Sequence, residues 1–111
     1  MAYSLVISLS KRQLSLLKDG SLIRNYPVAI GKKQTPTPTG TFTIVNKARQ
    51  PGGAYGAFWL GLSRPHYGIH GTNNPASIGK AISNGCIRMY NKDIKELAGL
   101  IPVGTAVRIS P

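Results

Sequence analysis

The stretch Ser83-Asn84-Gly85-Cys86-Ile87-Arg88-Met89 holds the single cysteine of this 111-residue chain, sixteen residues after the histidine of His70-Gly71-Thr72. The rest of the sequence is poor in catalytic groups, with three carboxylates and two histidines in all. A thiol with a histidine within reach is the basic requirement for nucleophilic acyl transfer. Cys86 and His70 are therefore the first candidates for a functional site.

Strand patterns lead up to this stretch and follow it. Apolar residues alternate through residues 4–17 and again through 22–30, with Asp19-Gly20 as the turn between the two segments. Shorter strands are expected at residues 41–45, 58–62, 67–70 and 105–109. The proline-bearing segment 31–40 and the glycine-rich segment 50–56 are typical of loops, and the second of these is expected to be mobile.

Helical signals are confined to two places. Asn74 and Pro75 are expected to begin one helical turn. The segment Asn91 to Ala98 is the best helix candidate, with Asn91 as N-cap and Gly99 at its end. No repeat or linker divides the chain, so residues 1–111 are expected to form a single β-rich domain.

The charge of the chain is strongly unbalanced, because 14 basic residues face only Asp19, Asp93 and Glu96, giving a net charge of +11. Such a surface attracts polyanions such as acidic cell-wall polymers, lipid headgroups or nucleic acid. The basic residues are scattered and lack interleaved aromatic residues, so nucleic-acid binding is not expected. Three acids are too few for a paired-carboxylate glycosidase, an aspartic protease or a two-metal site.

The sequence lacks several features that would indicate a membrane or a disulfide-bonded protein. No apolar run approaches the ~18 residues of a membrane span, and no signal peptide is visible at the start of the chain. A single cysteine rules out an internal disulfide, so the fold has to hold without one.

The chemistry of Cys86 sets requirements for its neighbours. A free thiol with a pKa of ~8.5 is only slightly ionised at neutral pH, and an adjacent imidazolium is expected to lower that pKa. The imidazole in turn needs an acceptor for its Nδ1–H, for which the carbonyl of Gly71 is the nearest candidate. His70 would then take the thiol proton and return it to the leaving amine.

The residues around Cys86 suggest how charge could be stabilised. Gly85 permits a tight turn, and the amides of Asn84, Gly85 and Cys86 would then point together as an oxyanion hole. If residues 86–88 are extended, Arg88 shares a face with Cys86 about 6.6 Å away. A cation there would stabilise the thiolate or bind a substrate carboxylate.

Structural roles compete with these functional ones. A lone cysteine is often a small buried hydrophobe, His70 could be a core histidine, and Arg88 could be an ion-pair partner. Tyr67, Phe58 and Trp59 are expected in the core or in a pocket wall.

A zinc site formed by His66, His70 and Cys86 is a more specific alternative. The two histidines approach each other only on a helix, which Pro65, Gly68 and Gly71 disfavour, and an extended chain separates them by about 13 Å. We therefore expect no metal and no cofactor.

Two motifs resemble one known family. The chain is similar to the catalytic domain of the L,D-transpeptidases (YkuD family), whose hallmark is a histidine followed some sixteen residues later by Ser/Thr-x-Gly-Cys. A second family motif matches Ala29-Ile30-Gly31-Lys32 and Thr37-Pro38-Thr39-Gly40-Thr41-Phe42. The resemblance extends from about Ser4 to Ile109. Many relatives carry His where this chain has Asn84, and some carry Ser where it has Gly71.

The resemblance implies a mainly β, sandwich-like catalytic domain with short helices. It implies Cys86 as nucleophile, His70 as base and then acid, and the Gly71 carbonyl as the group that orients His70. We further expect five residues to contribute to the oxyanion hole or to substrate binding: Ser83, Asn84, Gly85, Arg88 and Tyr67.

The implied substrate is a peptidoglycan tetrapeptide stem, cut between its third residue, a diamino acid, and the terminal D-alanine. A thioester at Cys86 would pass to an amine of a neighbouring stem as a 3→3 crosslink, or to water as a carboxypeptidase reaction. Acylation of Cys86 by carbapenems is expected as well. The substrate places such a protein at the cell wall, the cell envelope or a spore wall, where anionic wall polymers are further candidate partners.

Two other function classes remain open at this point. One is a non-catalytic module that binds polyanions or cell wall and carries a degenerate site. The other is a generic cysteine peptidase, which differs from a transpeptidase in whether the bond it cuts involves a D-centre.

Overall fold

Nine strands join in one sheet that closes on itself. In the computed structural model, which describes residues 2–111, the strand order is β2-β1-β9-β4-β5-β6-β8-β3-β7, and β2 also pairs with β3. The strands are β1 (Tyr3–Ser8), β2 (Gln13–Lys18), β3 (Ser21–Gly31), β4 (Gly40–Arg49), β5 (Phe58–Leu62), β6 (Gly68–His70), β7 (Ala81–Ser83), β8 (Ile87–Met89) and β9 (Ala106–Ser110). The helices are the two 3₁₀ turns η1 (Gly53–Tyr55) and η2 (Pro75–Ser77) and the α-helix α1 (Asn91–Leu100).

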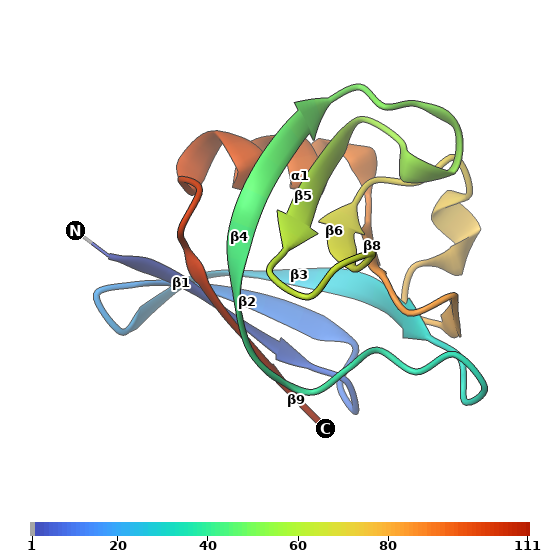
Figure 1. Cartoon of the computed structure of the whole chain (residues 1–111), viewed down its shortest axis with the longest axis horizontal. Helices are drawn as coiled ribbons and strands as arrows, with labels where there is room; N and C mark the ends of the chain where they lie inside the picture. Colours follow the sequence, from blue (N-terminus) through green and yellow to red (C-terminus); the bar gives the residue numbers. More distant parts are fainter. Residues whose placement is uncertain (1) are drawn as a thin grey trace.

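Two long strands connect the two layers of this barrel-like sandwich. The first half of β3 pairs with β2, whereas its second half pairs with β8 and β7. The first half of β4 likewise pairs with β9 and its second half with β5. In Figure 1, β1, β2, β3 and β9 form the lower layer, while β4, β5, β6 and β8 lie above it with α1 behind them. The expected mainly β, sandwich-like fold is confirmed.

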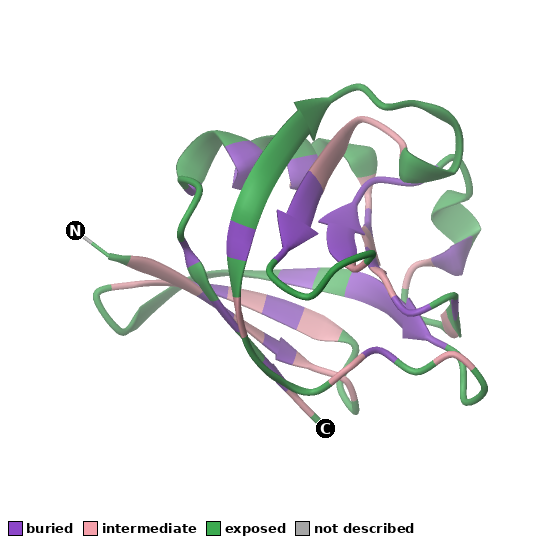
Figure 2. Ribbon diagram, in the orientation of Figure 1, coloured by how far each residue is buried: buried purple, intermediate pink, exposed green. Residues whose placement is uncertain are grey.

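The core lies between the layers and is filled by one face of each strand. Leu5, Ile7, Leu14 and Leu16 alternate with more exposed residues, as the sequence pattern indicates, and are 1% exposed or less. Figure 2 shows the same alternation along the ribbon and a continuous buried region at β5, β6 and the end of β3. α1 adds Ile94, Leu97 and Ala98 to this core.

Three expectations from the sequence need correction. The strand expected at residues 41–45 runs from Gly40 to Arg49, because β5 continues the pairing where β9 leaves it. Asn91 is not the N-cap of α1; Tyr90 holds that position, and the helix continues past Gly99 to Leu100. The three-residue strands β7 and β8 are too short to give an alternation that sequence patterns detect.

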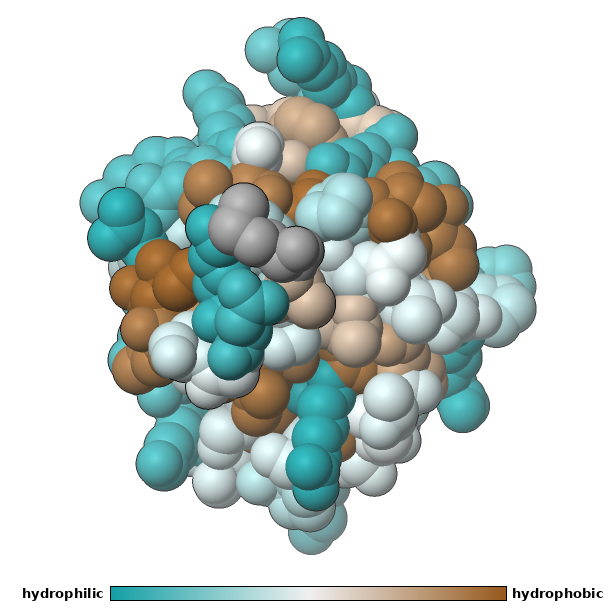
Figure 3. Space-filling view, turned by 90° about the vertical axis from the view of Figure 1, so that its left-hand side faces the viewer, coloured by the Kyte–Doolittle hydropathy of each residue, from teal (hydrophilic) through white to brown (hydrophobic). Residues whose placement is uncertain are grey.

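The surface carries no single large apolar face in the view of Figure 3, where hydrophobic side chains form separate patches between hydrophilic ones. Within residues 2–111, no helix has the length and apolar character needed to cross a membrane.

Replacing Ile87 by alanine tests the importance of β8 in the core. Ile87 is fully buried and pairs with Ile69 of β6, so Ile87→Ala is expected to lower the free energy of unfolding by about 2–5 kcal/mol. Urea denaturation followed by circular dichroism measures this. The control is Ile82→Ala on β7, where the side chain is 40% exposed and the loss is expected to stay near 0.5 kcal/mol. Equal losses in both variants would contradict this placement.

Candidate active site

The register of two short strands brings two of the expected site residues to one face of the sheet. β6 and β8 run parallel with Ile69 beside Ile87 and His70 beside Arg88. The isoleucines point into the core, so His70 and Arg88 project from the opposite face. Cys86 directly precedes β8, and the charge of Arg88 acts on both Cys86 and His70. The short strands thus assemble thiol, imidazole and guanidinium from two separate motifs.

The ring of His70 is fixed by its neighbours. Its Nδ1 lies 2.5 Å from the carbonyl oxygen of Gly71, and because a carbonyl only accepts, Nδ1 carries the proton. Nε2 is therefore the unprotonated, basic nitrogen. Trp59 of β5 stacks on the ring at a centroid distance of 5.6 Å, and Tyr55 meets it edge-on at 5.0 Å. These contacts leave His70 only 4% exposed.

Burial decides the charge state of the pair. Desolvation lowers the pKa of His70, and the charge of Arg88 lowers it further, against the opposing effect of the Gly71 carbonyl. Desolvation raises the pKa of the Cys86 thiol, opposed by the Gly68 backbone amide and by Arg88. In both groups the largest cause is burial, which favours the neutral form, and the expected imidazolium is not among the causes of the Cys86 shift. The resting pair is a neutral thiol and a neutral imidazole with a free basic Nε2.

The turn before Cys86 is held by Ser83. The Ser83 hydroxyl donates to the carbonyl oxygen of Cys86 at 2.6 Å and accepts from the amide of Gly85 at 3.1 Å. Ser83 is 1% exposed, so its hydroxyl serves the turn and is not free to bind a substrate. The Gly85 amide is engaged in this bond, and its contribution to an oxyanion hole stays a prediction.

Tyr67 explains why residue 85 is glycine. Gly85 has a φ of +119°, and a Cβ at this position would lie 2.6 Å from the Tyr67 ring. The Tyr67 ring packs against the turn that carries the thiol, and the guanidinium of Arg64 lies 5.4 Å from the ring centroid. Asn84, at the tip of the turn, is exposed.

The second sequence motif braces the same turn from behind. The carbonyl of Ser83 accepts from the Thr35 hydroxyl at 2.8 Å and from the Lys32 amide at 3.1 Å. The buried Thr37 hydroxyl accepts from the amide of Gly31 at 2.9 Å, which folds the loop back on β3. A Cβ on Gly31 would lie 2.2 Å from the Thr35 carbonyl oxygen. The two motifs that carry the family resemblance are therefore in direct contact.

A cavity of about 500 Å³ opens beside His70 on the same face of the sheet, and its lining residues are Ala48, Pro51, Tyr55, Trp59 and His66. The backbone carbonyl of His66 accepts from the Cys86 thiol at 3.7 Å, so this cavity borders Cys86. Tyr55 lies in the segment that the sequence indicates only as a mobile loop. No cluster of three or more His, Cys, Asp or Glu side chains suited to a metal ion occurs within residues 2–111.

Asn91 is a residue whose role the sequence patterns do not reveal. Its Oδ1 accepts from the amides of Ala57 (3.0 Å) and Thr72 (3.1 Å), and its Nδ2 donates to the Thr72 carbonyl at 3.0 Å. A Cβ on Gly71 would lie 2.1 Å from this Oδ1, and one on Gly56 would lie 2.3 Å from it. Asn91 thus ties α1 to the two backbone segments that flank the Gly71 carbonyl. The one sequence signal for it was a polar residue at the start of a helix.

Removing the charge of Arg88 is expected to shift both titrations at the site. In Arg88→Met the pKa of Cys86 rises, because the thiolate loses an attractive charge, and the pKa of His70 also rises, because the imidazolium loses a repulsive one. The rate of Cys86 alkylation by iodoacetamide against pH measures the first, and NMR of the His70 ring measures the second. Arg108→Met, on the exposed side of β9, removes the same charge as a control. A thiol titrating at lower pH in Arg88→Met would contradict the assignment.

Removing the side chain of Asn91 is expected to loosen the Gly71 carbonyl. Asn91→Ala leaves two amides and one carbonyl without this partner, so the free energy of unfolding is expected to fall by about 1–3 kcal/mol. The ¹⁵N spectrum of the His70 ring should lose its pure Nδ1–H signature. Asn74→Ala is the control, because the Asn74 side chain makes no capping bond to η2. An unchanged ring spectrum in Asn91→Ala would contradict the role of Asn91.

Comparison with known proteins agrees with this geometry. The family model for the L,D-transpeptidase catalytic domain, YkuD, matches residues 2–109. YkuD of Bacillus subtilis (strain 168), whose name assigns it provisionally to the L,D-transpeptidases, is 56% identical over 108 residues, which are 97% of this chain and 66% of the relative. This chain therefore spans about two thirds of the length of that relative.

Solved structures show the same fold. The catalytic domain of an L,D-transpeptidase from E. faecium superposes with a TM-score of 0.83 at 27% identity, covering 97% of this chain and 96% of that one. L,D-transpeptidase 3 from Mycobacterium tuberculosis gives a TM-score of 0.88 at 16% identity, covering 99% of this chain and 61% of that one. From its sequence motifs, its site geometry and the family match, the chain belongs to the L,D-transpeptidase catalytic domain family, YkuD.

Proposed function

We propose that this chain is a cysteine L,D-transpeptidase that acts on peptidoglycan stem peptides. The observation that carries the proposal is that Cys86 and His70 share the influence of the Arg88 charge, with His70 held as the Nδ1–H tautomer. A base of defined tautomer beside a thiol is the arrangement that acyl transfer requires. The family match supports the substrate class.

The first step forms a thioester. As the Cys86 sulfur attacks the carbonyl carbon of the diamino acid, Nε2 of His70 takes the thiol proton. The resulting imidazolium is stabilised at Nδ1 by the Gly71 carbonyl. The C–N bond to D-alanine then breaks, and the imidazolium returns the proton to the leaving amine, so that D-alanine departs neutral at nitrogen.

The second step transfers the acyl group. An amine of a neighbouring stem attacks the thioester carbonyl and gives its proton to His70, and the C–S bond breaks to release the sulfur, which regains that proton. The product is a 3→3 crosslink. With water as the attacking group, the same step yields a free carboxylate and a carboxypeptidase reaction.

Arg88 is the proposed anchor for a substrate carboxylate. Arg24 and Glu96, 3.0 Å apart, form the one ion pair found within residues 2–111, so Arg88 has no acidic partner there. A guanidinium without a carboxylate partner suits the terminal carboxylate of a stem peptide. Its position beside His70 also stabilises negative charge that develops on Cys86.

The substrate sets the proposed location at the cell wall, the envelope or a spore wall. The chain spans about two thirds of the length of the relatives that it matches first. Its location at the wall is therefore proposed here and is not taken from those relatives. One structural neighbour, at 26% identity and a TM-score of 0.86, is described as an avibactam carbamoyl enzyme. The carbamoylated neighbour supports the proposal that acylating inhibitors reach a nucleophile in this fold.

Acylation by a carbapenem tests the nucleophile directly. We expect the native chain to gain the mass of one intact carbapenem, because the sulfur bonds to the β-lactam carbonyl carbon, the ring C–N bond breaks, and the thiol proton passes to the ring nitrogen. Cys86→Ala should gain nothing, and His70→Ala should react at least about 100-fold more slowly. Intact-mass spectrometry after timed incubation measures all three.

Muropeptide assays then separate the activity from the alternatives. Release of D-alanine from a tetrapeptide stem by the native chain, and not by Cys86→Ala, supports the transpeptidase. A folded native chain that takes up no carbapenem and releases no D-alanine would overturn it in favour of a binding module. Cleavage only at bonds between L-residues would instead indicate a generic cysteine peptidase.

A further inference from the structure

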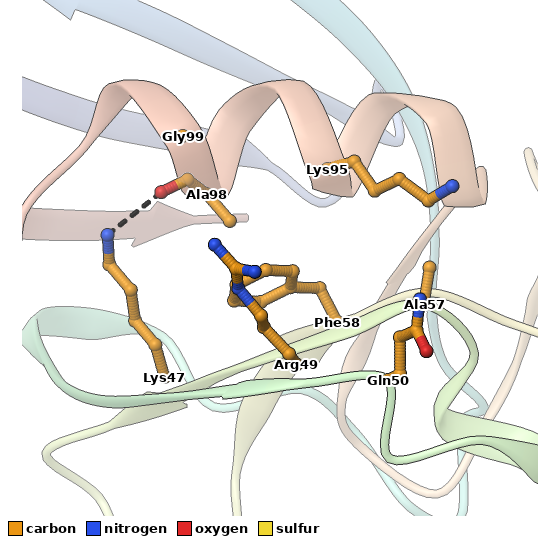
Figure 4. Close-up of a pocket in the computed structure, with 8 residues that line it drawn as sticks. All are labelled: Lys47, Arg49, Gln50, Ala57, Phe58, Lys95, Ala98 and Gly99. Atoms are coloured by element: carbon orange, nitrogen blue, oxygen red, sulfur yellow. Dashed lines mark hydrogen bonds between the residues drawn. The ribbon is translucent and has the colours of Figure 1, made fainter.

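A second cavity lies on the opposite face of the β4–β5 pair from the catalytic residues. In β5, Trp59 faces His70, so its neighbour Phe58 projects to the other side. Arg49 pairs with Phe58 across the two strands, and both line a cavity of about 550 Å³ between these strands and α1. We name this cavity the basic groove. Its lining consists of Lys47, Arg49, Gln50, Ala57, Phe58, Lys95, Ala98 and Gly99 (Figure 4).

Positive charge dominates the basic groove. Three of its lining residues are Lys or Arg and none is acidic. In Figure 4 the Arg49 side chain rises from the strand toward α1, while the Lys95 side chain leaves the helix and runs alongside it. The acids of α1, Asp93 and Glu96, line a different cavity with Arg24 and Tyr26, so the basic groove lacks a compensating carboxylate in its walls.

The three cations have different roles. Lys47 donates to the carbonyl oxygen of Ala98 at 2.8 Å, where it satisfies the last turn of α1. This bond holds the ammonium of Lys47 at the helix. Arg49 and Lys95 form no ion pair within the described chain, whose ion pair joins Arg24 and Glu96. They are the groups that remain available for a ligand.

We propose that the basic groove binds a polymer of phosphodiester-linked units, with Arg49 and Lys95 contacting successive phosphates. A guanidinium matches the geometry of phosphate oxygens through paired N–H donors, and an ammonium contributes a point charge. The net charge of +11 adds long-range attraction that grows with the number of charges on the ligand. A polymer therefore gains more from this surface than a single phosphate does.

The lining also argues against a nucleic-acid ligand. Sequence-tolerant binding of single strands depends on several aromatic side chains on which bases stack. Phe58 is the one aromatic residue among those that line the basic groove, and it is only partly exposed. The groove offers charge and a Gln50 amide without a stacking surface, which suits a chain of phosphates without bases.

The test compares two variants of equal net charge. Arg49→Gln/Lys95→Gln removes both available cations of the basic groove, whereas Lys11→Gln/Arg108→Gln removes two exposed cations elsewhere. Isothermal titration with poly(glycerol phosphate) at several salt concentrations measures the affinity. We expect the groove variant to bind at least about tenfold more weakly, with a log–log salt slope reduced by about 1.4 for two lost phosphate contacts. The affinity of the control variant should fall by less than about threefold.

Three results would overturn the proposal. Equal losses in the two double variants would mean that net charge alone binds the polymer. Poly-L-glutamate binding as tightly as poly(glycerol phosphate) would mean that the groove does not select phosphate. A single-stranded oligonucleotide binding more than tenfold more tightly would mean a nucleic-acid surface. Circular dichroism melting confirms that each variant is folded.

Repeating the titration on Cys86→Ala keeps this proposal separate from catalysis. The thiol lies on the other face of the β4–β5 pair, so the variant is expected to bind poly(glycerol phosphate) as the native chain does. Loss of carbapenem acylation with unchanged binding would therefore bear on the proposed function alone, whereas loss of binding in Cys86→Ala would overturn the separate groove.

Discussion

Burial of the His70 ring is the constraint on which the site depends. Trp59 and Tyr55 cover the ring, and the loss of water favours its neutral form. Burial of Cys86 raises the pKa of its thiol and favours the protonated form there as well. A neutral pair is stable in a low-dielectric site, whereas a separated ion pair there has to offset the desolvation of both charges. In the proposed reaction, the proton therefore moves only when a substrate carbonyl accepts the electrons of the sulfur.

The turn that carries the thiol is built to hold its shape. The Ser83 hydroxyl bonds within the turn, the loop with Thr35 bonds to its backbone, and Tyr67 packs where Gly85 leaves room. Three of these residues, Ser83, Gly85 and Tyr67, are ones that the sequence suggested for the oxyanion hole or substrate binding. A site in which the supporting groups are already satisfied keeps its geometry before the substrate arrives.

Much of this arrangement could be predicted from the sequence. Alternating apolar residues indicated the strands, and two motifs indicated the family and supplied the residues proposed as nucleophile and base. The directions of the two pKa shifts were not predictable, because both follow from burial, and the His70 ring is covered by Trp59 and Tyr55 from other parts of the chain. The role of Asn91 was hidden for a similar reason.

The basic groove is a further feature that the sequence alone does not predict. Arg49 ends β4 and Lys95 lies in the middle of α1, and only the packing of α1 against β5 brings them to one cavity. The sequence shows scattered positive charge, and scattering along the chain says nothing about clustering in space. Each strand of the β4–β5 pair presents alternate residues to opposite faces, so one pair of strands serves both cavities.

The close fit of Asn91 against Gly71 and Gly56 also constrains how the family can diverge. The amide oxygen occupies the space in which a side chain at position 71 would stand. A lineage that acquires serine there gains a hydroxyl but has to give up asparagine at position 91, or shift the start of α1. The two positions are therefore expected to change together during evolution, so that homologues divide into two compatible pairs of residues, with few intermediates between them.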